Sequence, residues 1–216
     1  LQVLSLPTRT NFRSVTKREV ALFQGPNGWG EFSPFLEYES AEAAYWLASG
    51  IEAAFGEPIQ LQREQIEINA TLPAVDSKLD VAEILSWYPG AKVVKIKVGG
   101  DLELDIARIK NTLAINPNLL IRLDVNGGWD LKSALLNLHD FHMRFGPVFE
   151  YIEQPCNAIS ELKELKKEVP MKIAVDESIR KFINDDHSEL GECADFAIIK
   201  WQPTGGISHA LKLVNE

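Results

Sequence analysis

The 216-residue sequence has few cysteines and no long apolar segment. Its two cysteines, Cys156 and Cys193, cannot build a disulfide framework, and no Cys-x-x-Cys pair is present to hold zinc. The longest apolar runs are only long enough for strands, and neither a signal peptide nor a membrane-spanning segment is visible. We therefore expect a protein of the reducing cytoplasm that does not enter a membrane.

The chain is also poor in positive charge. Its 22 Lys and Arg residues against 31 Asp and Glu residues leave a formal net charge of −9 and a pI near 5.0. An acidic surface argues against nucleic acid and anionic membranes as partners. With 45% hydrophobic and 25% charged residues, the composition is that of a globular protein with a sizeable core. The oligomeric state stays open.

Residues 1–64 have the pattern of a small α+β unit. The stretch "REVALFQGPNGWGEFSP" predicts an antiparallel hairpin with "GPNG" as its turn. The stretch "SAEAAYWLASGIEAAF" follows with helical spacing, and Ser40 is its expected N-cap.

From residue 65 onward, short apolar stretches alternate with amphipathic helical patterns. This alternation predicts a parallel sheet covered by helices, and both a doubly wound sheet and a TIM barrel satisfy it. The six strands are expected at 65–72, 92–98, 120–126, 149–153, 171–176 and 195–200.

An ionisable residue recurs where these strands end. Neighbouring members of the series lie 23 to 29 residues apart, which is the length of one β/α unit. Parallel strands would therefore bring all five to one end of a sheet, where barrels build their active sites. The series is Lys97, Asp124, Glu153, Asp176 and Lys200.

Three of these residues are carboxylates that would repel one another without a cation among them. An all-oxygen ligand set favours Mg²⁺, with Mn²⁺ as the alternative. In "AKVVKIKVGG", Lys95 and Lys97 lie two residues apart and project from the same face of a strand, toward those carboxylates. A lysine whose pKa is lowered can act as a base, which suggests metal-assisted removal of the proton α to a substrate carboxylate.

Several motifs in this order resemble those of the enolase superfamily, in its muconate-lactonising subgroup. They are "KIKVGG", "DVNGGWD", "YIEQPC", "AVDESIR" and "IIKWQPTGGI", and the resemblance extends over essentially all 216 residues. It implies an α/β protein with an N-terminal α+β capping domain at 1–64 and a (β/α) barrel at 65–216.

The resemblance also implies a role for each candidate residue. Lys97 would be the general base, Lys95 would assist it at the substrate carboxylate, and Lys200 would stabilise the enediolate from the opposite face. The Mg²⁺ ligands would be Asp124, Glu153 and Asp176.

Within the subgroup, the stretches "TNFRSVTKREVALFQGPNGWGEFSPFLEYESAEAAYWL" and "INATLPAV" are most similar to one group of dehydratases. Those enzymes convert a small-molecule carboxylate, 2-succinyl-6-hydroxy-2,4-cyclohexadiene-1-carboxylate, to an aromatic acid by syn dehydration in menaquinone biosynthesis. N-acylamino acid racemisation and dipeptide epimerisation use the same scaffold and remain the alternative reactions.

The expected strand count departs from that family. Six strands follow residue 64, whereas a closed barrel has eight, so the barrel is expected to be truncated after about six units. A fragment of a complete enzyme, an inactive remnant, and a chain completed by another chain are all compatible with this. The intact motifs favour the first.

Overall fold

A computed structural model describes residues 1–12, 15–60, 63–75, 77–181 and 188–215. The chain forms two compact units. The first consists of Leu1–Glu64 and Ile199–Glu216, and the second of Gln65–Ile198. The assignment of 1–64 as a capping domain and of 65–216 as the catalytic domain stays a prediction.

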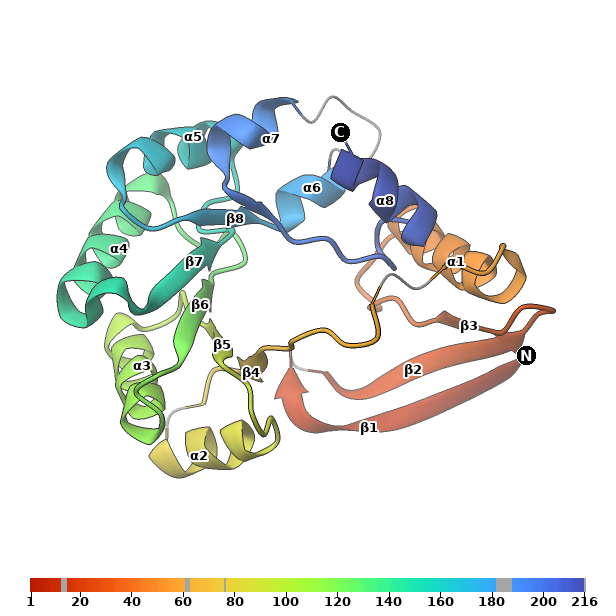
Figure 1. The fold of residues 1–216 in the computed structure, drawn as a ribbon, viewed down its shortest axis with the longest axis horizontal. Helices are drawn as coiled ribbons and strands as arrows, with labels where there is room; N and C mark the ends of the chain where they lie inside the picture. The colour runs from red at the N-terminus through yellow and green to blue at the C-terminus, as the bar shows by residue number, and fades with distance from the viewer. Residues whose placement is uncertain (13–14, 61–62, 76, 182–187, 216) are drawn as a thin grey trace. The chain divides into compact units, whose positions relative to one another are not determined.

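The first unit contains an antiparallel sheet with the strand order β1-β2-β3 (Figure 1). The hairpin predicted from "GPNG" is confirmed, because β2 pairs with β3 and the Gly25 N–H donates to the Gly28 carbonyl at 2.9 Å across the turn. Strand β1 was not expected from the sequence. The three strands are β1 (Gln2–Phe12), β2 (Val15–Gln24) and β3 (Trp29–Phe32).

Helix α1 (Ser40–Phe55) lies against β3 at a glycine. A Cβ atom on Gly50 would lie 2.5 Å from the carbonyl oxygen of Glu31, so only glycine permits this approach. Ser40 is the first helical residue, and the N-cap is Glu39, whose side chain makes no capping hydrogen bond. The predicted N-cap was therefore wrong by one residue, within the usual uncertainty of helix ends.

Helix α8 (Ile207–Asn215) also belongs to the first unit. The backbone N–H groups of Ile207 and Ser208 donate to the carboxylate of Glu52, which lies near the end of α1. Burial raises the pKa of Glu52, but the hydrogen bonds from Ser208 and Ile207 outweigh it and hold that pKa below its usual value. Glu52 therefore joins the two chain segments of this unit at the positive end of a helix.

The second unit is built on a parallel sheet of six strands in the order β4-β5-β6-β7-β8-β9. The predicted strand number and the parallel arrangement are confirmed. The strands are β4 (Ala70–Leu72), β5 (Val93–Lys97), β6 (Leu120–Asp124), β7 (Phe149–Glu153), β8 (Ile173–Val175) and β9 (Phe196–Ala197).

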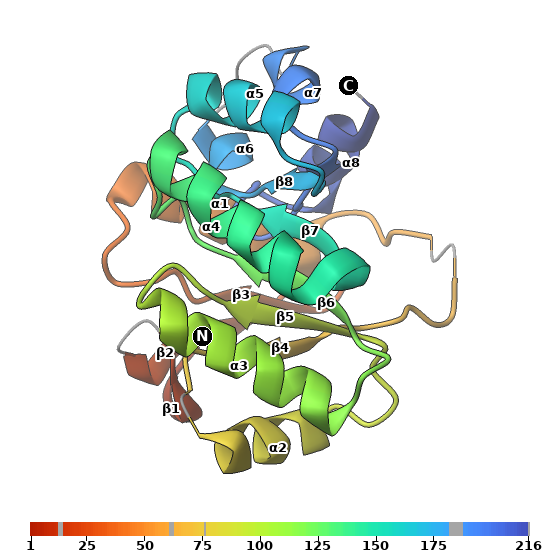
Figure 2. The ribbon, with the colours of Figure 1, turned by 90° about the vertical axis from the view of Figure 1, so that its left-hand side faces the viewer.

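Helices α2 to α5 lie on one face of this curved sheet (Figures 1 and 2). Alternate strand residues such as Ile96, Leu123 and Ile152 are fully buried. Because side chains alternate along a strand, Lys95, Lys97 and Asp124 project from the other face. The helices are α2 (Lys78–Ser86), α3 (Leu102–Ile115), α4 (Leu131–Phe145), α5 (Ile159–Glu168), α6 (Glu177–Lys181) and α7 (Ser188–Cys193), with a 3₁₀ turn, η1, at Gly146–Val148.

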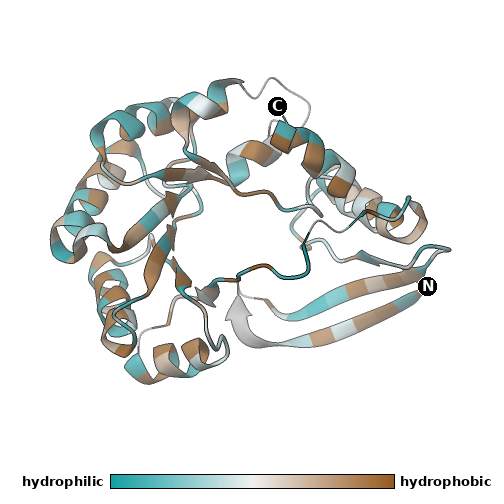
Figure 3. Ribbon diagram, in the orientation of Figure 1, coloured by the Kyte–Doolittle hydropathy of each residue, from teal (hydrophilic) through white to brown (hydrophobic). Residues whose placement is uncertain are grey.

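The hydropathy of the residues agrees with this arrangement of helices on the sheet. The covering helices alternate between apolar and polar residues, as expected for helices with one face on a sheet and one in solvent (Figure 3). In the part of the chain that the structure describes, no helix is both long enough and apolar enough to cross a bilayer.

The two terminal strands of the sheet are much shorter than predicted. The expected strand 65–72 is paired only at Ala70–Leu72, and the expected strand 195–200 only at Phe196–Ala197. Among the described residues, each of these strands has a neighbour on one side alone, so fewer backbone hydrogen bonds hold its ends. The four inner strands lie within one or two residues of the predicted ends.

The Glu52 contact predicts a pH-dependent contribution to stability. Glu52→Gln should lower the free energy of unfolding by about 0.5 kcal/mol at neutral pH, because a partly exposed carboxylate is screened by solvent. The folded-state pKa is depressed, so this contribution is present above the unfolded value and is lost as the pH falls below about 4.3. Denaturant unfolding at several pH values measures it. Glu57→Gln, at an exposed position just beyond α1, is the matched control, and an equal loss in both variants would contradict the role of Glu52.

Candidate active site

The carboxyl ends of the inner strands bring the predicted ionisable residues into one row. The register pairs Lys97 with Asp124 across β5 and β6, and Asp124 with Glu153 across β6 and β7. Asp176 follows β8 directly, and its charge acts on Glu153. The predicted convergence at one end of the sheet is therefore observed for residues of the second unit.

Lys95 lies at the centre of this cluster. Its Nζ atom is 2.8 Å from Asp124 Oδ2, 2.8 Å from Glu153 Oε1 and 2.7 Å from Glu153 Oε2. Asp124 and Glu153 are each only 1% exposed, and the side chain of Lys95 is 17% exposed. One ammonium group thus compensates two buried carboxylates that would otherwise repel each other.

Lys97 lies beside the same carboxylate. Its Nζ atom is 2.6 Å from Asp124 Oδ2 and also donates to Oδ1 of Asn126. The Asn126 amide in turn donates to Glu177 Oε1 at 3.0 Å, and the Asn126 backbone N–H donates to Asp124 Oδ1 at 3.1 Å. Asn126 has a positive φ of 53°, which folds the chain back over the end of β6.

The two lysines have pKa values shifted in opposite directions. Burial lowers the pKa of Lys95, but the carboxylates of Asp124 and Glu153 outweigh it and hold that pKa above its usual value. Burial also lowers the pKa of Lys97, and there it prevails over the attraction of Asp124. Lys95 is therefore the stable cation, and Lys97 is the easier one to deprotonate.

The two carboxylates differ as well. Burial raises the pKa of Asp124, but Lys95 and Lys97 outweigh it and hold that pKa below its usual value. Burial and the neighbouring charge of Asp124 raise the pKa of Glu153. Of these two carboxyl groups, Glu153 is therefore the one that takes up a proton more readily.

The donor set fits a hard divalent cation. Asp124, Glu153 and Asp176 offer carboxylate oxygens from three adjacent strands, and all three are buried. Among the described residues, no three Asp, Glu, His or Cys side chains are already gathered around one point, and the Lys95 ammonium lies between Asp124 and Glu153. The Lys95 ammonium therefore shows where Asp124 and Glu153 together bind a positively charged group.

Lys200, the fifth residue of the series, belongs to the first unit. Its carbonyl accepts hydrogen bonds from the N–H and the Oγ1 of Thr204, both at 3.2 Å, in the turn before α8. Its predicted place on the opposite face of the substrate stays a prediction.

The structure also shows a buried ion pair that the sequence analysis did not single out. Arg108 Nη1 donates to Asp105 Oδ1 at 2.7 Å and to the carbonyl of Lys97 at 2.9 Å, and Asp105 Oδ2 accepts from the Gly99 N–H at 2.8 Å. The pair therefore holds the end of β5 and the turn after Lys97. This pair could have been predicted from the sequence, because Asp105 and Arg108 lie on the buried face of a helix that also carries Ile106 and Ile109.

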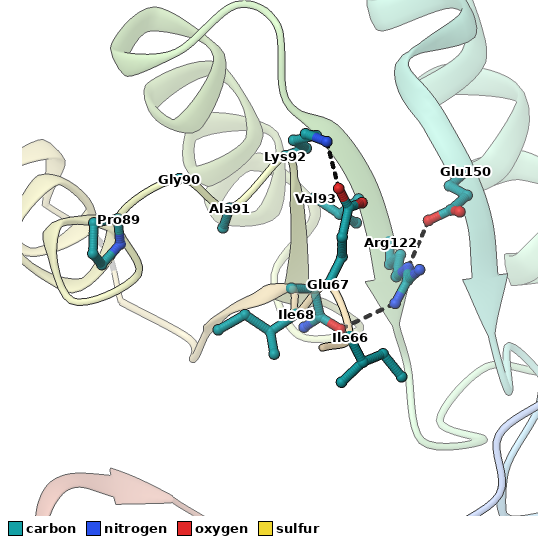
Figure 4. Close-up of a pocket in the computed structure, with 11 residues that line it drawn as sticks. Ile66, Glu67, Ile68, Pro89, Gly90, Ala91, Lys92, Val93, Arg122 and Glu150 are labelled. Atoms are coloured by element: carbon teal, nitrogen blue, oxygen red, sulfur yellow. Dashed lines mark hydrogen bonds and ion pairs between the residues drawn. The ribbon is translucent and has the colours of Figure 1, made fainter. Parts of the chain in front are cut away.

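A second polar cluster, at the amino ends of the strands, lines a cavity of about 350 Å³ (Figure 4). Arg122 Nε donates to Glu150 Oε2 at 2.6 Å and Arg122 Nη1 to Asn69 Oδ1 at 3.0 Å, while Lys92 pairs with Glu67. These groups satisfy one another, and polar contacts at this end of a barrel typically serve stability. The carboxyl ends of the strands are therefore the candidate active site.

Comparison with known families identifies this architecture. Residues 3–54 match the family described as "Enolase N-terminal domain-like", and residues 80–215 match "Enolase C-terminal domain-like". The chain belongs to the enolase superfamily. The resemblance inferred from the motifs is thereby confirmed.

Among curated enolase-superfamily proteins, the chain is similar to o-succinylbenzoate synthase of Mycobacterium bovis (strain BCG / Pasteur 1173P2). The two are 44% identical over 216 residues, which cover 99% of this chain and 65% of the relative. The chain thus spans less than two thirds of the length of that relative.

Two solved structures share the fold at lower sequence identity. An o-succinylbenzoate synthase from Thermosynechococcus elongatus BP-1, complexed with Mg in its active site, has a TM-score of 0.70 and 21% identity, covering 99% of this chain and 78% of the other. An L-Ala-D/L-Glu epimerase from Bacillus subtilis has a TM-score of 0.74 and 21% identity, covering 98% and 76%. These similarities support the fold assignment.

The position of Lys95 leads to a stability prediction. Lys95→Met should lower the free energy of unfolding by about 3 kcal/mol above neutral pH, since it leaves two buried carboxylates without their shared cation. The carboxyl pKa values would then rise in the folded state, so the deficit should shrink as the pH falls and one carboxylate takes up a proton. Denaturant unfolding at about pH 8 and pH 5 tests this. Lys92→Met, which removes a solvent-exposed ion pair with Glu67, should change little, and a pH-independent deficit in Lys95→Met would contradict the explanation.

Proposed function

We propose that this chain carries the catalytic machinery for Mg²⁺-dependent syn dehydration of 2-succinyl-6-hydroxy-2,4-cyclohexadiene-1-carboxylate to o-succinylbenzoate. This lyase reaction belongs to menaquinone biosynthesis, and cytoplasm is the compartment we infer for it. The observation that carries the proposal is that Lys97 has a lowered pKa and lies beside the buried carboxylate of Asp124. The 44% identity with a mycobacterial o-succinylbenzoate synthase supports the choice of reaction.

In this proposal, Asp124, Glu153 and Asp176 hold the Mg²⁺ ion, for which Mn²⁺ can substitute. The ion supplies positive charge that stabilises the anion left when the substrate loses its α-proton. Lys95 already binds Asp124 and Glu153, and it is the group that we expect to contact the substrate carboxylate.

Lys97 acts as the general base. Its neutral amine takes the α-proton as the carbon–hydrogen bond breaks, and the ammonium so formed returns a proton to the departing hydroxyl on the same face. The carbon–oxygen bond breaks, the ring becomes aromatic, and water is the second product. Lys200 stabilises the anionic intermediate from the opposite face, and residues 1–64 cap the bound substrate.

The same proton abstraction would also serve racemisation of N-acylamino acids or epimerisation of dipeptides. The epimerase among the solved structures with this fold is the reason to include these substrates in the assay. An inactive remnant is the third possibility, and it predicts a folded chain without turnover on any of the substrates.

The decisive test is Mg²⁺-dependent turnover of the cyclohexadiene carboxylate by the purified 216-residue chain. Lys97→Ala should lower the rate by about 10³-fold, because it removes the general base. The measurement is the ultraviolet absorbance change on aromatisation, with the spontaneous rate subtracted. EDTA should abolish the turnover of the unmodified chain.

Lys110→Ala is the control, because this exposed lysine of α3 lies outside the cluster. Turnover that survives in Lys97→Ala would contradict the assignment of the base. Turnover of N-succinyl amino acids without dehydration would replace the proposed reaction by racemisation.

The lowered pKa of Lys97 leads to a pH prediction. A general base must be unprotonated, so kcat/KM should rise with pH as Lys97 loses its proton. The apparent pKa should lie below the ordinary lysine value of about 10.4. A pH–rate profile measures it, and circular dichroism verifies that the chain stays folded across the range. A rate that is constant between about pH 6 and pH 9 would contradict the role of Lys97.

A further inference from the structure

Gln154 adopts a backbone conformation that few residues other than glycine adopt. It lies between Glu153 and Pro155 at the end of β7, has a φ of 40° and is fully buried. Residues that carry a side chain seldom adopt this left-handed backbone conformation. Contacts with neighbouring residues must therefore hold Gln154 in it.

The side chain of Gln154 connects the end of β7 to the end of β8. Its Oε1 atom accepts from the backbone N–H groups of Asp176 at 2.9 Å and Ser178 at 3.2 Å. Its Nε2 atom donates to Ser178 Oγ at 2.7 Å and to the Cys156 carbonyl at 2.9 Å. All four hydrogen-bonding positions of the amide are thereby used.

The main chain of Gln154 extends the same network in both directions. Its N–H donates to the Ala174 carbonyl at 2.8 Å, and its carbonyl accepts from the Gly127 N–H at 2.6 Å. Gly127 belongs to the turn that follows Asp124. One residue therefore joins the segments that carry all three candidate ligands, Asp124, Glu153 and Asp176.

We propose that Gln154 is a positioning residue that fixes the separation of the Glu153 and Asp176 carboxylates, so that they bind a divalent cation together. Glu153 precedes it in the chain, and the backbone N–H of Asp176 is bonded to its amide oxygen. The proposal rests on the metal site of the proposed function and adds a residue that does not touch the metal.

Mn²⁺ binding to the 216-residue chain, followed by electron paramagnetic resonance, tests this role without requiring turnover. Gln154→Met keeps the approximate length of the side chain and removes its four hydrogen bonds. We expect it to weaken Mn²⁺ binding by about 10-fold, since loss of groups that orient metal ligands typically has this effect. The spectrum of the bound ion should also change, because the ligand geometry changes.

Arg122→Met is the matched control. It also replaces a long polar side chain that makes hydrogen bonds to two residues in the second unit, but at the amino ends of the strands. Binding is compared at a temperature at which circular dichroism shows each variant to be folded. If Gln154→Met does not fold, Ser178→Ala removes one of the four hydrogen bonds and should still weaken Mn²⁺ binding, by a smaller factor.

Asp176→Asn separates the two proposals. If Asp176→Asn weakens Mn²⁺ binding while Gln154→Met or Ser178→Ala leaves it within about twofold of the unmodified chain, the positioning role is overturned and the metal site stands. If the unmodified chain does not bind Mn²⁺, or Asp176→Asn has no effect, the metal site and the positioning role are both overturned. Equal weakening in Gln154→Met and Arg122→Met would show a loss of general stability and would also overturn the positioning role.

Discussion

The ammonium group of Lys95 between Asp124 and Glu153 is the interaction on which this end of the sheet depends. Without it, two buried carboxylates of like charge would repel each other; for unit charges about 4 Å apart the repulsion is about 4 kcal/mol at an effective dielectric constant of about 20. The strands cannot slip to relieve this repulsion. Ile121, Leu123 and Ile152 are buried against the helices, and a shift by one residue would expose them.

The apolar face of the sheet therefore determines where the charges lie. Ile96 and Leu123 pair across β5 and β6, so Lys97 and Asp124, one residue further along each strand, must also be neighbours. The register of the strands also determines which charged residues are neighbours at the amino ends of the strands, but the arrangement there is different. There Arg122 and Glu150 form an ion pair, whereas the carboxyl end holds the three acidic residues of the proposed ligand set and two lysines.

The sequence predicted the parts of this arrangement that repeat along the chain. Strand ends recur at regular distances, so the alignment of Lys97, Asp124 and Glu153 could be inferred before any coordinates. The lengths of β4 and β9 could not be predicted, because their apolar residues match a longer strand, while in the described part of the chain each pairs with one neighbouring strand only. Strand β1 was missed for a related reason, since its pairing with β2 is a property of the sheet rather than of its own residues.

Gln154 and Arg108 were missed because their roles depend on contacts between distant segments. The Gln154 amide reaches residues up to 24 positions away, and its positive φ leaves no mark in the sequence, because glutamine is not a residue that favours it. Arg108 donates to the carbonyl of Val75, in the loop after β4, and to the carbonyl of Lys97, the last residue of β5. Only its place on the buried face of α3, next to Asp105, could have indicated that it is paired inside the protein.

The two lysines of β5 have different charge requirements that a single lysine could not meet. They lie on the same face of one strand, yet their pKa values are shifted in opposite directions. The carboxylates of Asp124 and Glu153 outweigh burial at Lys95, whereas burial prevails at Lys97. A lysine that stabilises two buried anions must stay charged, which is what the raised pKa of Lys95 achieves. A lysine that removes a proton must first lose its own charge, and the burial that lowers the pKa of Lys97 favours that loss. The proposed function therefore needs both lysines, because one side chain cannot stay charged between Asp124 and Glu153 and also act as the base.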